Sequence, residues 1–417
     1  MKALVYDVKP EEIIHLIQEA RESKEAYLGE HSPLSLADVP EPTVPFPDWL
    51  LIETRLCGIC GSDYKQVFID FEGVDSPMAT LATFPQVMGH EVVGRVHAVG
   101  PAVTSLRPGQ RVVLNPWLSC APRGITPVCE MCDDGQYSLC LNFKRGRLAA
   151  GIHTGVCRDA PGGYAPYVPA HESMAIPVPD EVSDDAAVLA DPFSVSLHSV
   201  LRHPPSPGDI VVVYGCGTLG LCAIEILKKL FDARIYAITR FEHQAELARR
   251  LGALETIPWR PVDDIVTRFA AIAGAREILP PIEGTGGVPM LHGARGVRVV
   301  YNTVGTPESV EVSVRIAGPR STVVLSGVDT PGRFEWSPHY FKEIELVGSN
   351  AFGVEEWNGK RQHAMRHYFD LIRDRRVDVT PILTHRFRLE DYKAAFRATH
   401  EQGDSGAVKV LFDFTRG

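Results

Sequence analysis

The chain has 417 residues, of which 45% are hydrophobic and 23% charged, and its formal net charge is −10. This length exceeds what one hydrophobic core usually supports and suits two domains, and the composition excludes a disordered or fibrous protein. The charges form no clustered basic face, which excludes the usual nucleic-acid binder. The N-terminus, MKALVYDVKPEEIIHL, lacks the apolar run of a signal peptide, and no stretch of about 18 apolar residues exists. We therefore expect a soluble, cytoplasmic protein with no membrane or nucleic-acid partner.

The first part of the chain, to about residue 180, predicts a β-rich domain. Strand-like runs lie at residues 51–57, after His90 (EVVGRVHAVG) and from Arg111 (RVVLNPWL), with glycine and proline turns between them. Residues 11–24 predict a charged amphipathic helix, most simply a solvated elaboration of the surface. A subunit contact or an active-site lid is the alternative for this helix.

From about residue 184, strands and helices alternate. Residues 210–215 form the continuous apolar run expected of a strand buried on both faces, and apolar residues at helical spacing follow between 219 and 230. The runs ARIYAIT, VRVVYNTVG, STVVLSGV and IELVGSN continue the series and predict a parallel sheet with right-handed crossovers. The proline- and glycine-rich residues 278–296 predict a loop, GKRQHAMRHYFDLIRDRR predicts a helix, and AVKVLFDF predicts a closing strand.

A glycine-rich turn separates the strand at 210–215 from the helix after it. Its sequence, GCGTLG, fits the G-x-G-x-x-G pattern, in which the glycines allow a tight turn, close approach of a pyrophosphate and close helix–strand packing. The strand before it, the helix after it and the second strand are the context that this pattern requires. The residues predicted to hold a dinucleotide are Gly215, Gly217, Thr218, Leu219, Gly220, Thr239, Arg240, Val304, Gly327 and Asn350.

Four of the nine cysteines lie within twenty-one residues of one another. Cys129, Cys132 and Cys140 follow Cys120 on a segment rich in proline and glycine. Four thiolates around one ion close a tetrahedral shell and leave no position for substrate, which is typical of a structural zinc site. The alternative, four unpaired thiols, is hard to sustain on one short loop.

A second group of metal-ligand residue types lies in Cys60-Gly61-Ser62-Asp63 and Gly89-His90-Glu91. One thiolate, one imidazole and one carboxylate with an open fourth position form a zinc site that can act as a Lewis acid, because a coordinated alcohol loses its proton more readily. Ser62, two residues after Cys60, can pass that proton towards solvent. The spacing alone does not establish these contacts, since Cys60 and His90 are thirty residues apart.

The chain resembles the zinc-containing medium-chain dehydrogenases, a family that includes alcohol, sorbitol and threonine dehydrogenases. The resemblance covers almost the whole chain. It rests on the four-cysteine lobe, the glycine-rich turn, GICGSD (58–63), GHEVVGRVHAVG (89–100), GGYAPYV (162–168) and ADPFSVSLHS (190–199). It implies an α/β protein with a GroES-like catalytic domain (1–185) that carries the zinc lobe, a Rossmann NAD(P)-binding domain (186–350) and a C-terminal return to the catalytic domain (351–417).

The resemblance also implies roles for individual residues. Cys60 and His90 would bind the catalytic zinc, with either Glu91 or Asp191 as the third protein ligand. Ser62 would be the relay hydroxyl, and Asp63 would hold a ligand in place. The expected metal ligands are therefore Cys60, His90, Glu91, Asp191, Cys120, Cys129, Cys132 and Cys140, and the expected catalytic residues are Cys60, Ser62, His90 and Asp191.

Three positions depart from the family pattern. Cys120 lies nine residues before Cys129 instead of three, which implies an expanded loop. Lys65 stands where many alcohol dehydrogenases have the histidine that ends the proton relay. Asp191 stands where polyol dehydrogenases usually have Glu and threonine dehydrogenases have Asp. The remaining thiols, Cys57, Cys157, Cys216 and Cys222, are expected to be buried packing residues.

The cofactor is expected to be NADP rather than NAD. In the family's pattern the second strand ends thirteen residues before the glycine of LGA, Gly252, and that position is Thr239. An acid there would bond the ribose 2′-hydroxyl, whereas Thr239 is neutral and the next residue, Arg240, can pair with a 2′-phosphate. Alternatively, Arg240 stacks on the adenine, points to solvent or is neutralised by Glu242.

These features predict an enzyme with two zinc ions per chain that transfers a hydride between NAD(P) and an alcohol, whether a secondary alcohol, a polyol or an amino alcohol. We expect it to form a homo-dimer or homo-tetramer. One alternative is an inactive relative that binds nucleotide, and another is a zinc-independent enzyme of the quinone reductase type. Both are disfavoured by the residues available for an open zinc site.

Overall fold

The computed structural model describes residues 1–417 except 71–79, 282–286, 330–331, 334 and 417. The chain divides into two compact units. Unit 1 comprises Met1–Asp191, Met365–Arg373 and Leu383–Gly417, and unit 2 comprises Pro192–Ala364 and Asp374–Ile382. The helix α5 (Ala190–Arg202) begins in unit 1 and continues in unit 2.

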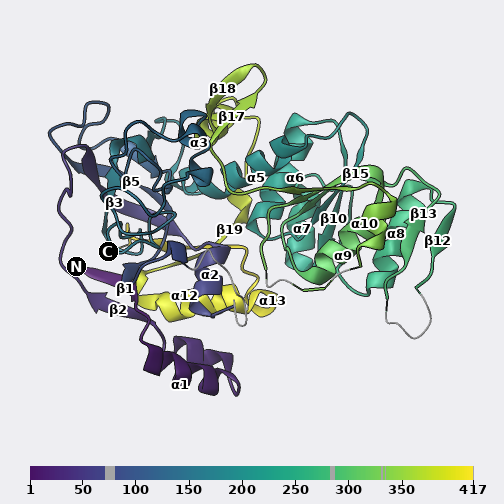
Figure 1. Cartoon of the computed structure of the whole chain (residues 1–417), viewed down its shortest axis with the longest axis horizontal. Coiled ribbons are helices and arrows are strands. Elements are labelled where there is room, and N and C mark those ends of the chain that lie inside the picture. The colour runs from purple at the N-terminus through teal and green to yellow at the C-terminus, as the bar shows by residue number, and fades with distance from the viewer. Residues whose placement is uncertain (71–79, 282–286, 330–331, 334, 417) are drawn as a thin grey trace. The chain divides into compact units, whose positions relative to one another are not determined.

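Unit 1 is built on a seven-stranded sheet of order β19-β20-β3-β5-β6-β8, with β7 also paired to β3 (Figure 1). Its strands are β3 (Trp49–Gly58), β5 (Glu91–Val99), β6 (Arg111–Leu114), β7 (Tyr167–His171), β8 (Ala175–Pro177), β19 (Leu383–Phe387) and β20 (Lys409–Asp413). A smaller sheet joins β2 (Leu34–Asp38), β1 (Lys2–Tyr6) and β4 (Gln86–Val87). The pairing of β20 with β3 explains how the end of the chain becomes part of the N-terminal sheet.

Short helices connect these strands. They are α1 (Pro10–Ala20), α2 (Gly61–Val67), α3 (Glu130–Asp133), α4 (Asp184–Ala187), α11 (Ala364–Arg373), α12 (Tyr392–His400) and α13 (Gln402–Ser405). The core of the unit includes Trp49, Val92, Tyr164, Phe396 and Phe412, which are all buried. The prediction of a helix within residues 11–24 is confirmed by α1.

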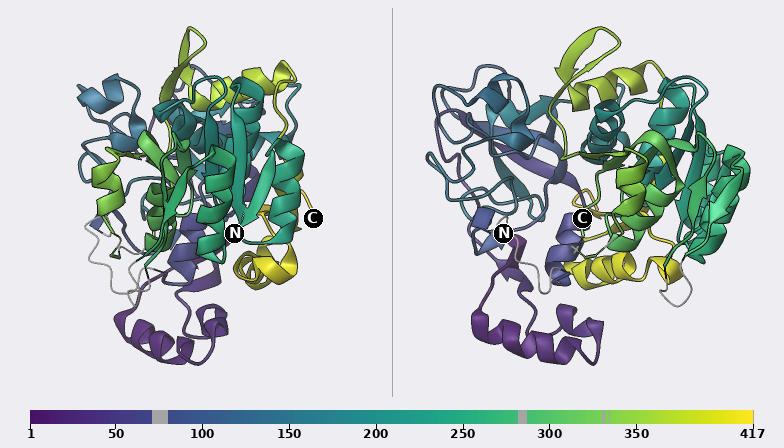
Figure 2. Two further views of the ribbon diagram at one scale, coloured as in Figure 1. Left: turned by 90° about the vertical axis from the view of Figure 1, so that its right-hand side faces the viewer. Right: turned by 45° about the vertical axis from the view of Figure 1, so that its right-hand side comes forward.

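Unit 2 contains a six-stranded, all-parallel sheet of order β11-β10-β9-β14-β15-β16. Its strands are β9 (Ile210–Tyr214), β10 (Arg234–Thr239), β11 (Glu255–Pro258), β14 (Val297–Asn302), β15 (Ala317–Leu325) and β16 (Glu345–Gly348). The connecting helices are α6 (Thr218–Leu230), α7 (Glu242–Leu251), α8 (Val262–Ala273), α9 (Pro307–Ile316) and α10 (Ser337–Phe341). Helix α6 packs with α7 and α8 packs with α9, and the views of Figure 2 show helices on both sides of the sheet.

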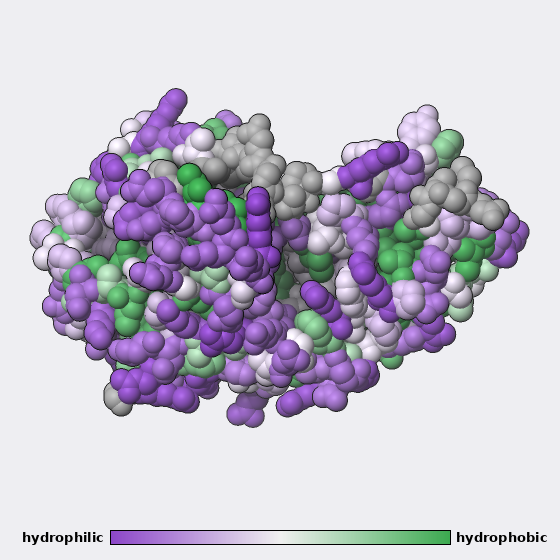
Figure 3. Space-filling model, turned by 90° about the horizontal axis from the view of Figure 1, so that it is seen from below, coloured by the Kyte–Doolittle hydropathy of each residue, from purple (hydrophilic) through white to green (hydrophobic). Residues whose placement is uncertain are grey.

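The fold is that of a GroES-like β-rich unit with a Rossmann-like parallel-sheet unit, as the sequence predicts. The face of the molecule in Figure 3 is covered mostly by hydrophilic residues, with hydrophobic residues in smaller groups. Among the described helices, none has the length and apolar character needed to cross a membrane.

Two local predictions are partly wrong. Residues 278–296 were expected to form a loop, but β12 (Glu277–Leu279) and β13 (Met290–His292) pair as antiparallel strands, anchored by the buried Leu291; residues 282–286 lie outside the described part. The predicted helix GKRQHAMRHYFDLIRDRR begins only at Ala364, because its first residues form a hairpin.

That hairpin joins β17 (Val354–Trp357) to β18 (Lys360–His363). Its two-residue turn is Asn358-Gly359, with φ of 52° and 71°. Asn-Gly with both φ values positive is the preferred two-residue hairpin turn, because its twist matches that of the flanking strands. The turn chemistry overrides the helical pattern at this point.

Candidate active site

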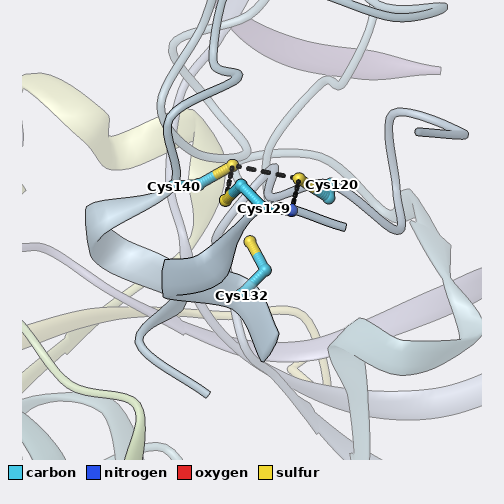
Figure 4. A group of neighbouring side chains, drawn as sticks. All are labelled: Cys120, Cys129, Cys132 and Cys140. Carbon is cyan, nitrogen blue, oxygen red and sulfur yellow. Dashed lines mark hydrogen bonds between the residues drawn. The ribbon is translucent and has the colours of Figure 1, made fainter. Parts of the chain in front are cut away.

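The four lobe cysteines converge on one point (Figure 4). The sulfur of Cys140 lies 3.7 Å from that of Cys120 and 4.0 Å from that of Cys129, and all four sulfurs lie within 4.8 Å of one another. A tetrahedron of sulfurs about 2.3 Å from zinc has edges of about 3.8 Å. The donor set and spacing therefore fit a structural zinc ion with no open position.

The surroundings of these sulfurs suit thiolates. The backbone N–H of Cys129 and the side-chain amide of Asn142 donate to the sulfur of Cys120 at 3.3 and 3.2 Å. The hydrogen bond between Cys132 and Cys140 lowers the pKa of Cys132 and raises that of Cys140, so this pair favours one thiolate, on Cys132. Zinc binds the deprotonated form of cysteine, so a lowered thiol pKa favours the metal-bound state.

A buried arginine organises the expanded loop between Cys120 and Cys129. The side chain of Arg123 is fully buried and donates hydrogen bonds of 2.7–3.1 Å to the carbonyls of Leu118, Arg145, Leu148, Ala149 and Gly151. Such bonds offset the cost of burying its charge. Arg123 thus ties the expansion to the segment that leads to His153, and the sequence pattern did not identify it.

The second group of ligands forms where β3 ends and β5 begins. Cys60 precedes the first residue of α2, and His90 and Glu91 stand at the start of β5. One donor atom from each of Cys60, His90 and Glu91 lies within 4.8 Å of the other two. His90 and Glu91 are buried and Cys60 is partly exposed. A thiolate, an imidazole and a carboxylate at this spacing fit zinc with a position left open.

Asp63 supports this group. Its carboxylate accepts hydrogen bonds from the backbone N–H of Cys60 (2.9 Å) and the hydroxyl of Tyr164 (2.7 Å), and lies 3.6 Å from Nδ1 of His90. Burial raises the pKa of Asp63, but its contacts with His90, Tyr164 and the backbone N–H of Cys60 together outweigh burial and leave the pKa below its ordinary value. Gly89 is required here because its φ is +92° and a Cβ would overlap the ring of Tyr164.

The two carboxylates proposed as third ligand are placed differently. Glu91 belongs to the cluster with Cys60 and His90, whereas Asp191, in the first turn of α5, is not among the residues that converge there. Burial and the neighbouring charge of Glu91 raise the pKa of Asp191 to about 7.

A buried lysine that the sequence pattern did not identify balances the negative charge of Glu91. Lys409 of β20 is buried, forms an ion pair with Glu91, and donates to the carbonyl of Ile59 at 2.9 Å. Gly58 leaves room for this pair, since a Cβ there would overlap both side chains. The signal in the sequence was a single lysine inside the apolar strand AVKVLFDF.

The predicted relay residues lie on α2. Ser62 is exposed and Lys65 is half-buried. The four remaining thiols, Cys57, Cys157, Cys216 and Cys222, are buried and form no disulfide, as expected of packing residues.

In unit 2, the glycine turn has the geometry that a dinucleotide requires. Gly215 follows β9 with φ of +92°, Gly217 has open space around it, and Gly220 has none, since a Cβ there would overlap the carbonyl oxygen of Gly215. Thr218 begins α6, so the N-terminus of this helix lies beside Gly217, and a helix N-terminus favours a bound phosphate. The first glycine makes the turn, the second admits a phosphate and the third allows α6 to pack closely.

The other predicted cofactor residues follow parallel strands of the same sheet. The N–H groups of Val304 and Gly305 donate to the buried side chain of Asn302, at 3.0 and 2.9 Å. Gly327 packs against the backbone of Thr303, where a Cβ would not fit. Asn350 lies just beyond β16. The carboxyl ends of parallel strands are where such sheets bind ligands.

The end of β10 carries a cation between two aromatic rings. Thr239 is buried, and the guanidinium of Arg240 lies 5.1 Å from the ring centre of Phe241 and 5.3 Å from that of Trp259. Glu242 pairs with Arg249 at 2.6 Å instead of Arg240. In the described part of the chain, no carboxylate neutralises Arg240.

Comparison with known proteins agrees with this architecture. Residues 46–180 match the family described as "Alcohol dehydrogenase GroES-like domain", and residues 218–365 match "Zinc-binding dehydrogenase". The chain is 32% identical to (R,R)-butanediol dehydrogenase of Saccharomyces cerevisiae, over 90% of this chain and 93% of the relative. It is 27% identical to L-threonine 3-dehydrogenase of Chromobacterium violaceum, over 91% of this chain and 96% of the relative.

Among solved structures, the chain is similar to a zinc-binding dehydrogenase of Sinorhizobium meliloti bound to NADP, with a TM-score of 0.68 and 26% identity over 91% of this chain and 95% of the other. The two ligand clusters, the glycine turn and these matches along nearly the whole chain lead to one conclusion: the protein belongs to the zinc-containing medium-chain dehydrogenases and is a zinc-dependent NAD(P) dehydrogenase of the alcohol/polyol type.

Proposed function

We propose that this protein is a dehydrogenase that interconverts a small secondary alcohol, polyol or amino alcohol with its carbonyl compound, using NADP in preference to NAD. The observation that carries the proposal is the convergence of Cys60, His90 and Glu91 within 4.8 Å. The relatives named for butanediol and threonine support an alcohol with a second polar group as substrate.

The residues of unit 1 have distinct tasks. Cys60, His90 and Glu91 would hold zinc, which when bound polarises the oxygen of an alcohol or carbonyl. Asp63 orients His90 through the 3.6 Å contact with Nδ1. The hydroxyl of Ser62, exposed on α2, receives the proton that the alcohol loses and passes it to solvent.

The preference for NADP rests on the end of β10. Thr239 offers no carboxylate to bond a ribose 2′-hydroxyl or to repel a 2′-phosphate. Arg240 stacks over Trp259 and leaves its N–H groups for an anion. Glu242, two residues after Arg240 in the sequence, pairs with Arg249 and does not compete for Arg240.

The test is the ratio of kcat/KM for NADP to that for NAD, measured with a panel of polyols, amino alcohols and simple secondary alcohols. We expect wild type to favour NADP, and Arg240→Ala to lower kcat/KM for NADP roughly tenfold or more while changing that for NAD little. Arg250→Ala, an exposed cation on α7, is the matched control and should leave the ratio unchanged. A wild type that favours NAD, or a preference that survives Arg240→Ala, would refute the assignment.

A further inference from the structure

Trp117 and His153 face one another in an isolated antiparallel bridge of unit 1. Backbone hydrogen bonds from Leu118 to Ile152 (3.0 Å) and from Thr154 to Pro116 (2.9 Å) hold the bridge on either side. Directly opposed residues of an antiparallel pair project their side chains to the same face. The rings of Trp117 and His153 accordingly lie 5.8 Å apart in an edge-to-face arrangement.

This pair adjoins the Cys60–His90–Glu91 cluster. The ring centre of His153 lies 4.6 Å from that of His90. Trp117 and His153 are each only 8% exposed, so any polar atom they offer acts in a largely water-free place. Neither residue belongs to the set that converges to bind metal.

The pair offers one hydrogen-bond donor and one acceptor that the described protein does not use. Nδ1 of His153 lies 2.6 Å from the carbonyl of Thr154, so Nδ1 carries the hydrogen and Nε2 of the neutral ring is an acceptor. Among the described residues, the His153 ring makes its hydrogen bond through Nδ1 and not through Nε2, and Nε1–H of Trp117 is buried without an acceptor. A buried N–H without an acceptor is costly, which points to a ligand that accepts from Trp117 and can donate to Nε2 of His153 beside it.

A second Trp–His pair in unit 1 differs from this one, because its histidine has no unused nitrogen. Trp49 lies opposite His171, and its Nε1–H also has no acceptor among the described residues. Both nitrogens of His171 are engaged, however, Nδ1 with Ser173 at 2.8 Å and Nε2 with Asp48 at 3.3 Å. That pair therefore offers no acceptor, and its residues are not part of either ligand cluster.

We propose that Trp117 and His153 form a subsite for a hydroxyl group on the carbon next to the reacting alcohol carbon, so that the enzyme acts on vicinal diols or polyols. A hydroxyl accepts from Trp117 and donates to His153 at once. A carboxylate or ketone would satisfy Trp117 only, and an ammonium group His153 only. This inference rests on the proposed alcohol dehydrogenase activity and narrows its substrate class.

The experiment compares two substrates that differ by one hydroxyl, butane-2,3-diol and butan-2-ol, in wild type, Trp117→Phe and His153→Phe. Each variant removes the polar atom and keeps an aromatic ring. We expect wild type to favour the diol, and each variant to lower kcat/KM for the diol roughly 10–100-fold while changing that for the monoalcohol less than about threefold. Trp49→Phe, which removes the same N–H in the other pair, should change neither value, and all variants should retain two zinc ions.

Two outcomes overturn the subsite: an equal loss for both alcohols, which indicates a structural role, or no loss for either. A wild type that prefers the monoalcohol also overturns it. If wild type turns over neither alcohol with either nucleotide, the proposed function fails separately. Calorimetric titration of the zinc-loaded protein with butane-2,3-diol and with butan-2-ol then decides the subsite. The subsite is supported if wild type binds the diol more tightly and if Trp117→Phe and His153→Phe abolish this difference. Equal binding of the two alcohols by wild type refutes it.

Discussion

At the scale of single residues, the active site depends on how each charge is balanced. Glu91 is paired with the buried Lys409, and Asp63 is paired with His90 and bonded to Tyr164. Asp191 is buried near Glu91 and has a pKa raised to about 7. Because Glu91 and not Asp191 lies in the cluster with Cys60 and His90, we expect Glu91 to be the metal ligand and Asp191 to act beside it.

Metal analysis of Glu91→Gln and Asp191→Asn tests this assignment. We expect Glu91→Gln to lose about one zinc ion per chain and all turnover, because an amide is a much weaker ligand than a carboxylate. Asp191→Asn should keep both zinc ions and turn over more slowly. If Asp191→Asn loses zinc and Glu91→Gln retains it, then Asp191 is the third zinc ligand and Glu91 is not.

Sequence patterns identify the residues that a motif carries but not those that only the fold brings together. Cys60, His90 and Glu91 occur in motifs of recognisable chemistry, so the site is predictable. Lys409 lies more than three hundred residues from Glu91 along the chain, and their contact exists only because β20 pairs with β3. His153 likewise meets His90 through an isolated bridge that no periodicity marks.

At the scale of elements, the zinc lobe is a region of few regular strands or helices that Arg123 and the four cysteines hold together. Its helical content is limited to α3 and a short 3-10 turn at Tyr137–Leu139. A loop of this kind gains order from the ion and from the five carbonyls bound by Arg123.

Arg123→Met is therefore expected to lower the free energy of unfolding by roughly 2–4 kcal/mol, since five carbonyls lose a charged donor and three of these hydrogen bonds are buried. It should also weaken retention of the structural zinc. Arg145→Met, an exposed arginine of the same lobe, is the control and should change stability little. Chemical denaturation with zinc analysis measures both effects, and equal behaviour of the two variants would contradict the role of Arg123.

A carboxylate also secures the start of α4. Asp184 accepts hydrogen bonds from Arg55 of β3 at 2.5 Å and from Arg111 of β6 at 2.7 and 3.0 Å. Burial raises the pKa of this carboxyl, but the two guanidinium groups outweigh it and hold the pKa below its ordinary value. The folded protein thus binds this proton less readily than the unfolded chain does.

It follows that Asp184 stabilises the fold fully above about pH 4, the ordinary pKa of an aspartate, and that this contribution disappears as the pH falls through the lower pKa of the folded state. Asp184→Asn should cost roughly 1–2 kcal/mol at pH 7 and progressively less below pH 4. Denaturation at several pH values, with the exposed Asp180→Asn as control, measures the difference. A penalty that does not depend on pH would rule out the charge effect.

The elements themselves were predictable where one pattern prevails. The apolar run at 210–215 and the glycine turn after it correspond to β9 and the start of α6. The helical periodicity of residues 359–376 predicts a helix over the whole stretch, but the Asn358-Gly359 turn forms a hairpin before α11. Local turn chemistry decides such boundaries when the flanking pattern permits both structures.

At the scale of the whole molecule, we expect association into a homo-dimer or homo-tetramer. Tyr340 and Phe341 of α10 are 74% and 78% exposed, and large apolar side chains gathered on a surface are typical of a contact with another protein. Light scattering should give about two or four times the chain mass of 45.8 kDa. A particle with the mass of one chain at micromolar concentration would contradict this expectation.

The central claim is that the Cys60–His90–Glu91 cluster holds the zinc on which turnover depends, while the four-cysteine lobe holds a second, structural ion. The most direct test removes the more weakly held zinc with a chelator and then measures the rate of NADP reduction as zinc is returned. We predict that turnover falls to zero at one zinc per chain and recovers in proportion to the amount of the second zinc ion that is returned. Cys60→Ser should retain one zinc ion and its fold, and it should show no turnover when zinc is added. Full turnover with one zinc per chain, or activity in Cys60→Ser, would contradict the account.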